Sequence, residues 1–229
     1  MPNFYDDEFG DITVRRSSMS NSIKLSISPS GALRVSMPKY APLFMAKRLV
    51  ASSRSKIRSL IKQQHPAISY FNGMQIGKSH NLQIVADHKL KVETHGQSLT
   101  LYMPISSTIE DNDVQMILRE AVIKALRKEA KSYLPKRLTY LAQQHGFNFQ
   151  SVRFSHASSR WGSCSSNKTI SLNIALMKLD FNLIDYVLKH ELAHTIEMNH
   201  SNDFWDIVHT MDSNYKANRK LLKMQTPSV

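Results

Sequence analysis

The 229-residue sequence has a single cysteine, Cys164, which excludes a disulfide within the chain and favours a reducing compartment. It has no apolar run near the roughly 18 residues that a membrane span needs. Its opening letters, MPNFYDDEFGD, lack the basic start and the apolar stretch of a secretory signal. These absences predict a soluble cytoplasmic protein without a membrane segment.

Glycine and proline are scarce, with 7 and 8 residues, and no long linker, repeat or low-complexity segment is visible. The hydrophobic fraction of 41% is typical of a packed globular protein. The polar run SSTIEDND marks a domain boundary near 105–113. We expect an N-terminal β-rich region with a basic helix over 1–110 and a second domain over 111–229, or a single compact unit.

The spacing of apolar residues predicts a mixed α+β fold. Residues 1–10 are acidic and lack apolar periodicity, so we expect a mobile end. In SIKLSISPSGALRVSM, alternation on both sides of a turn at 28–31 predicts a β-hairpin. Pro135 should kink or divide a long helix that Gly146 ends. The expected elements are the hairpin, a basic helix over 45–64, strands over 82–104, a helix over 114–145, short strands at 151–154 and 169–174, and a helix over 182–198.

Positive charge is concentrated in the first two thirds of the chain. The net charge is +12, and residues 1–150 hold 21 basic and 11 acidic groups, whereas 151–229 hold 9 and 7. The basic helical patterns predict either a nucleic-acid-binding surface or ordinary solvated helix faces. No zinc finger, helix-turn-helix or RNA-binding motif decides between these. The oligomeric state is not determined by the sequence.

The stretch VLKHELAHTIEMNHSNDFW contains H-E-x-x-H at His190, Glu191 and His194. One helical turn brings the two imidazoles to the same face, where both can bind one metal ion. Glu191 is rotated by about 100° from His190, which places its carboxylate beside a metal-activated water, as a general base requires. The competing interpretation is a pair of core histidines, which is unfavourable because burying such polar groups without a metal is costly.

A third metal ligand is expected just after this helix. His200 lies six residues after His194, as in H-E-x-x-H-x-x-G-x-x-H, although Glu197 stands at the glycine position. The turn must then come later, and Asn199 tolerates the left-handed conformation that helix ends use. Three imidazoles favour one zinc ion. The alternative third ligands are Asp203, Asp206 and His209.

Several neighbouring residues have more than one possible role. Arg160 and Trp161 are predicted to bind substrate, or to form a structural arginine–tryptophan corner. Phe204 and Trp205 are expected to pack beneath the metal site, and Cys164 to be a small buried or half-buried residue. The candidates for an oxyanion-stabilising donor are His156, Arg160, His209 and Tyr215.

The segments RWGSCSSNKTISLNIAL and IDYVLKHELAHTIEMNHSNDFW resemble the YgjP-like family of predicted metal-dependent hydrolases, related to the SprT-like and WLM groups of zincin metallopeptidases. The resemblance is strongest over 151–206 and extends to most of the chain. It implies a zincin-like domain whose antiparallel strand above the active-site helix can receive an extended peptide. It also implies zinc bound by His190, His194 and His200, with Glu191 activating water.

These patterns lead to three functional hypotheses. The first is a zinc-dependent metallopeptidase that hydrolyses a peptide or protein substrate through a metal-activated water, with Glu191 as the general base. The second retains the metal but hydrolyses nucleotides or other phosphoanhydrides, although the chain lacks a Gly-rich phosphate loop. The third is a DNA-associated protease that is recruited through the basic helices.

Overall fold

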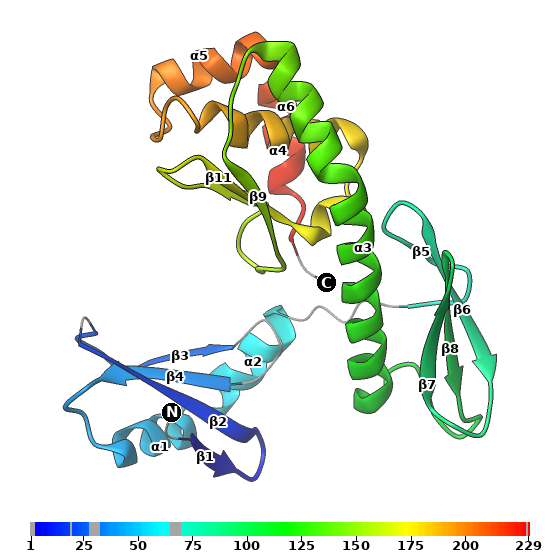
Figure 1. The fold of residues 1–229 in the computed structure, drawn as a ribbon. Helices are drawn as coiled ribbons and strands as arrows, with labels where there is room; N and C mark the ends of the chain where they lie inside the picture. The colour runs from blue at the N-terminus through cyan, green and yellow to red at the C-terminus, as the bar shows by residue number, and fades with distance from the viewer. Residues whose placement is uncertain (1–2, 19, 28–32, 65–69, 228) are drawn as a thin grey trace. The chain divides into compact units, whose positions relative to one another are not determined.

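The computed structural model describes residues 3–18, 20–27, 33–64, 70–227 and 229, with the backbone alone described at 60–64. The chain has a mixed α+β fold and divides into two compact units, 1–69 and 70–229 (Figure 1). The predicted boundary at 110/111 therefore lies inside the second unit, between β8 (Ser98–Met103) and α3 (Asn112–His145). The reason is that the sheet containing β8 packs against α3.

The first unit contains a four-stranded sheet and two helices. The strands are β1 (Asn3–Asp6), β2 (Gly10–Ser17), β3 (Lys24–Ile27) and β4 (Leu33–Pro38), in the order β1-β2-β4-β3. The helices are α1 (Leu43–Ser52) and α2 (Arg54–Gln64). Strand and helix side chains form one apolar core that includes Ile12, Val14, Val35, Met37, Val50 and Ile57.

The structure confirms some N-terminal predictions and corrects others. The antiparallel pairing of β3 with β4 confirms the hairpin, whose predicted turn at 28–31 lies outside the described residues. The expectation of a mobile end is wrong for residues 3–10, because β1 pairs with β2 along four positions. The basic helix expected over 45–64 is two helices, which meet at Ser53.

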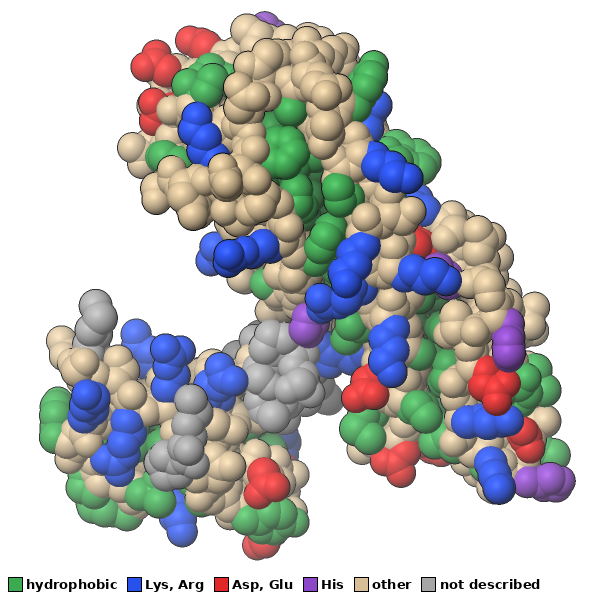
Figure 2. All heavy atoms as spheres, viewed as in Figure 1, with side chains coloured by type: hydrophobic (Ala, Val, Ile, Leu, Met, Phe, Trp, Pro, Cys, Tyr) green, Lys and Arg blue, Asp and Glu red, His purple; other side chains and the backbone are tan. Residues whose placement is uncertain are grey.

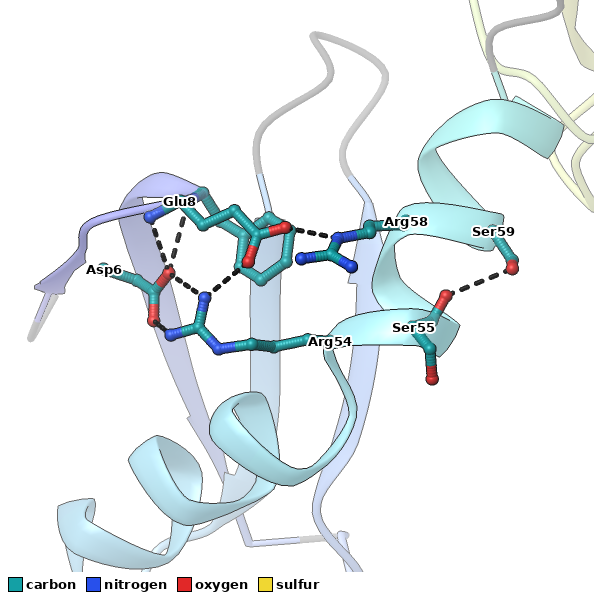
Figure 3. A network of polar contacts seen from close by, with 7 residues as sticks. Asp6, Glu8, Arg54, Ser55, Arg58 and Ser59 are labelled. Carbon is teal, nitrogen blue, oxygen red and sulfur yellow. Dashed lines mark hydrogen bonds and ion pairs between the residues drawn. The ribbon is translucent and has the colours of Figure 1, made fainter.

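Acidic residues at the end of β1 and in the β1–β2 connection bind arginine side chains of α2 (Figure 3). Arg54 reaches Asp6 at 3.0 Å and Glu8 at 2.6 Å, and Arg58 reaches the other oxygen of Glu8 at 2.5 Å. Hydrogen bonds from Arg58 and Arg54 lower the pKa of Glu8. Two arginines that suggested a nucleic-acid surface therefore already have carboxylate partners within their own unit.

The second unit begins with another four-stranded sheet. Its strands are β5 (Gln75–Ile76), β6 (His80–Ala86), β7 (Lys91–His95) and β8, in the order β5-β6-β8-β7, which agrees with the strands expected over 82–104. Helix α3 contacts this sheet and also β9 (Ser151–Ser155) and α4 (Phe181–Ala193) of the C-terminal part (Figure 1). Pro135 does not divide α3, and Gly146 ends it with a left-handed φ of 75°, as predicted.

A buried carboxylate on α3 joins the helix to the start of β6. Glu129 is 7% exposed and accepts hydrogen bonds from the backbone N–H groups of Lys78, Ser79 and His80 at 2.6 to 3.1 Å. It also accepts from the Ser79 hydroxyl at 2.8 Å and lies 2.6 Å from His80 Nδ1. A Cβ at Gly77 would collide with this carboxylate, so the residue must be glycine.

The remaining elements carry the residues predicted to bind metal, to catalyse hydrolysis and to bind substrate. Strands β9 (Ser151–Ser155), β10 (Gly162–Cys164) and β11 (Thr169–Asn173) form a sheet in the order β10-β11-β9. β9 and β11 were predicted, whereas β10 was not, because Gly-Ser-Cys shows no apolar alternation. After these come η1 (Ile174–Lys178), α4 (Phe181–Ala193), α5 (Asn202–Met211) and α6 (Tyr215–Lys223).

Two further observations concern the predicted nucleic-acid partner and the expected lack of a membrane segment. On the face drawn in Figure 2, lysine and arginine side chains gather along α3 within the second unit. In the part of the chain that the structure describes, no helix is both long enough and apolar enough to cross a membrane.

Candidate metal centre

Helix α4 carries His190 and Glu191 of the H-E-x-x-H motif and is followed directly by His194, and its apolar stripe is buried in the second unit. Leu183, Val187, Leu188 and Leu192 are at most 5% exposed, and the helix packs against α3, α5, α6 and β10. Asp185 on its outer side forms a bidentate ion pair with Arg137 of α3, at 2.8 and 2.6 Å. Asp185 thus anchors the helix to α3.

The three predicted histidine ligands converge at the end of α4. One ring nitrogen from each of His190, His194 and His200 lies within 4.8 Å of the other two. The Nε2 atoms of His190 and His200 are 3.2 Å apart. Burial, reinforced by His194 and then by His200 and Arg219, lowers the pKa of His190 to about 3. This ring is therefore neutral at physiological pH, which is the form that binds a metal.

The chain turns toward His200 earlier than the sequence predicted. Helix α4 ends at Ala193 and not at 198, and hydrogen-bonded turns follow from Leu192 to Glu197. Asn199 is not left-handed, since Lys168 is the only described non-glycine residue with a positive φ. The Glu197 carboxylate accepts the Asn199 N–H at 3.1 Å, so a side chain stabilises a turn that glycine would have provided.

The ring of His194 is oriented by the same turn. Its Nδ1 lies 3.0 Å from the Glu197 carbonyl, to which it donates a hydrogen bond in the tautomer that leaves Nε2 free for a metal. Nδ1 of His190 is buried and has no hydrogen-bond partner among the described residues. The ring orientation of His194 is thus supported by a protein acceptor, whereas that of His190 depends on packing.

The donor set fits a zinc ion. Two nitrogens that share a tetrahedral zinc at 2.0–2.1 Å lie about 3.3 Å apart, close to the 3.2 Å between the Nε2 atoms of His190 and His200. Neutral imidazoles are good ligands for zinc, and three of them leave one position of a tetrahedron for water or substrate. Within the described residues, the alternative ligands Asp203, Asp206 and His209 do not join this group.

Aromatic side chains of α5 support the triad. The Phe204 ring is fully buried and lies 4.4 to 4.9 Å from the rings of all three histidines. Trp205 stacks on His200 at 5.7 Å with an angle of 28°. Ser201 begins α5 by accepting the Phe204 N–H at 3.3 Å. Phe204 is therefore buried against the histidines, where the sequence placed it, whereas Trp205 lies beside His200 and is half-buried.

Glu191 is buried beside the triad, with 4% of its surface exposed. One carboxylate oxygen, Oε2, has no hydrogen-bond partner among the described residues. Burial raises the pKa of Glu191 to about 8, and the charge of Arg160 opposes this shift. A carboxylate without a compensating partner is costly to bury. Its position is therefore typical of a functional group and not of a structural ion pair.

Gly162 of β10 makes room for this carboxylate. A Cβ at position 162 would lie 2.5 Å from Oε1 of Glu191 and 2.8 Å from its Cδ and Cγ. Gly162 is the residue that the sequence argument overlooked, although it stands within the quoted motif RWGSC. A glycine that directly follows the bulky Trp161 was the available hint of a close approach.

The loop with the two predicted substrate-binding residues is held by Asn173. Arg160 is exposed and Trp161 half-buried. The Asn173 side-chain amide donates to the carbonyls of Ala157 and Arg160, at 2.6 and 2.9 Å, and its N–H donates to the Trp161 carbonyl at 2.8 Å. Because Asn173 is fully buried at the end of β11, it fixes this loop to the sheet.

The remaining residues singled out in the sequence lie in different surroundings. His209 and Tyr215 contact each other through their rings at 5.8 Å, and Tyr215 also stacks on Trp205. Burial, and then Arg127 and Arg119 of α3, lowers the pKa of His156. Cys164 is half-buried, as predicted, and burial followed by the charge of Glu191 raises its thiol pKa.

Comparisons with known proteins identify a matching family and two similar solved structures. A family model described as "YgjP-like, metallopeptidase domain" matches residues 21–225. Among solved structures, the metallopeptidase zymogen of Pyrococcus abyssi abylysin is similar at 26% identity and a TM-score of 0.36, covering 42% of this chain and 98% of its own. The zymogen of Methanocaldococcus jannaschii jannalysin has 21% identity and a TM-score of 0.34, with coverages of 39% and 91%. No curated protein matches the chain.

Proposed function

The chain belongs to the YgjP-like metallopeptidase family, and on that premise we propose that it hydrolyses peptide bonds as a zinc-dependent enzyme with Glu191 as the general base. The observation that carries this proposal is the convergence of three imidazole nitrogens within 4.8 Å beside a buried carboxylate. His190, His194 and His200 would hold the ion. A bound zinc ion supplies Lewis acidity, which polarises a carbonyl group and makes water more acidic.

Glu191 would carry the proton during hydrolysis. As the water oxygen attacks the scissile carbonyl carbon, one proton passes to a Glu191 oxygen, and the same proton then protonates the leaving amine as the C–N bond breaks. This role requires the ionised carboxylate, whereas burial raises its pKa to about 8 against the opposing charge of Arg160. A nearby cation favours ionisation, so we expect Glu191 to be a competent base only in the metal-loaded protein.

The substrate would bind along β10. This strand is at the edge of the sheet β10-β11-β9 and packs against α4, so its outer edge can pair with an extended peptide. Arg160 and Trp161 immediately precede β10, on the loop that Asn173 holds. We propose that these two side chains contact the bound peptide. The oxyanion donor is left unassigned, because none of its four candidates is distinguished by a contact.

The decisive experiment compares Glu191→Gln with the unchanged protein and with Glu197→Gln as a matched control. In the control, glutamine can still accept the Asn199 N–H, so zinc content and turnover should be retained. Glu191→Gln should retain zinc and lose casein hydrolysis by a factor of about 10² to 10⁴, the usual contribution of a general base. Undiminished hydrolysis by Glu191→Gln would remove the proposed base. Hydrolysis of nucleoside triphosphates but not casein would favour the phosphoanhydride alternative.

A further inference from the structure

A pocket of about 560 Å³ lies beside the triad, between the start of α5 and the start of α6. This volume lies in the range of small-ligand sites. Its lining residues are Asn202, Trp205, Asp206, Tyr215, Lys216 and Arg219. Trp205 also faces the triad, with its ring centroid 5.7 Å from that of His200 and 5.9 Å from that of His190. The Trp205 indole therefore contacts both the pocket and the triad.

Arg219 is presented at this indole by stacking. Its guanidinium carbon lies 4.4 Å from the centroid of the Trp205 ring, which stacks on Tyr215 at 5.5 Å and 17°. Stacking uses the flat face of a guanidinium group and leaves its N–H donors available in the plane. Those donors form the fork that binds a carboxylate through two parallel hydrogen bonds.

The positive charge of the pocket is not neutralised by the protein. Among the described residues, no carboxylate forms a salt bridge with Lys216 or Arg219, in contrast to the paired arginines of α2. Asp212, which precedes α6, is engaged by the Asn214 N–H at 3.0 Å and the Asn218 amide at 2.9 Å. Asp206 is the one acid in the lining, against two cations. The pocket is therefore net positive and suits an anionic group.

We propose that this pocket binds a carboxylate group of the peptide substrate, from an acidic side chain or the C-terminus, and that Arg219 is a specificity-determining residue. The inference rests on the proposed peptidase function, because Trp205 lines the pocket and also contacts His190 and His200 of the triad. Trp205 and Tyr215 would contact the aliphatic part of the bound residue, and Lys216 would add to the attraction. Asp206 would weaken it.

The test uses the full-length zinc-loaded protein and matched fluorogenic peptides. One set replaces glutamate by glutamine at each position around the cleaved bond, and the other compares free with amidated C-termini. We expect kcat/KM to be about tenfold higher for the charged member at one position, the effect of one charge-assisted hydrogen bond at an exposed site. The set that shows the preference identifies which carboxylate is bound.

Variants then assign the preference to the pocket. Arg219→Gln should reduce the charged-to-neutral ratio to near one, Asp206→Asn should increase it, and Lys220→Gln, which removes a neighbouring charge outside the lining, should leave it unchanged. Equal cleavage of charged and neutral peptides by the unchanged protein would refute this inference and leave the peptidase function intact. If no peptide is cleaved by protein shown to contain zinc, both proposals fail. The peptide comparison does not depend on whether any variant folds.

Discussion

Gly162 and Glu191 fit together so closely that a Cβ at position 162 would lie 2.5 Å from Oε1 of the carboxylate. Real Cβ atoms essentially never approach another atom this closely. Gly162 is also the one described glycine without a positive φ, so its backbone would accept alanine. The glycine is therefore required by the space that Glu191 occupies and not by a turn.

We predict that Gly162→Ala inactivates the enzyme while zinc stays bound. The added methyl group must displace Glu191 or β10, and a shift of about 1 Å in a catalytic group costs on the order of 100-fold in rate. The measurement is kcat/KM on a peptide substrate together with the zinc content. Ser171→Ala in β11 is the control, since it adds no bulk next to Glu191. Full activity of Gly162→Ala would show that the carboxylate position is unimportant.

Replacing the third histidine should weaken zinc binding. Because His200 supplies one of three ligand nitrogens, His200→Ala should lower zinc affinity by at least about 100-fold, as measured by competition with a chelator. His209→Ala is the matched control, because His209 lies outside the group although it was an alternative ligand by sequence. If His209→Ala loses zinc and His200→Ala retains it, the ligand set is wrong.

The Glu129 cluster predicts a pH-dependent stability. Burial raises the pKa of Glu129, but hydrogen bonds from His80, Lys78 and Ser79 outweigh this and hold the pKa below its ordinary value. A lowered folded-state pKa stabilises the protein above the ordinary carboxyl pKa, and this stabilisation is lost as the pH falls through the folded value. Glu129→Gln should thus lower the free energy of unfolding by about 3 kcal/mol at pH 7 and by less in acid.

Denaturant unfolding from pH 7 down to about pH 2 checks this prediction, because the loss begins only below the ordinary carboxyl pKa. The difference between the unchanged protein and Glu129→Gln should shrink as the pH falls. Glu120→Gln serves as the control, because Glu120 is an exposed residue of the same helix. A constant difference across this pH range would mean that the charge of Glu129 is not what joins β6 to α3.

The paired arginines of α2 predict a structural role for Glu8. Glu8→Gln should weaken its ion pairs with both Arg54 and Arg58, and amide hydrogens of β1 and α2 should exchange faster as a result. Glu110→Gln provides a comparison in the second unit.

DNA binding through the basic helices stays a prediction. It requires a DNA affinity that falls steeply as the salt concentration rises, and a DNA affinity unaffected by salt would exclude it.

Sequence patterns predicted most elements near the candidate site because those patterns are local. The strands β9 and β11 alternate, α4 shows an apolar stripe, and Gly146 supplies the left-handed residue that ends α3. Two predictions that differ from the structure, the end of α4 and the missing strand β10, have local causes as well. Glu197 stabilises an early turn through its carboxylate, and β10 has only three residues without an apolar pattern.

The sequence alone determined that His190 and His194 share one helix face with Glu191 beside them, because helical spacing fixes those angles without reference to the rest of the chain. Tertiary structure decided what surrounds them. The closeness of Gly162 to Glu191, the stack of Arg219 on Trp205 and the pairing of Arg137 with Asp185 each join residues from different elements. Such contacts depend on how whole elements pack, and no local pattern encodes their distance or direction.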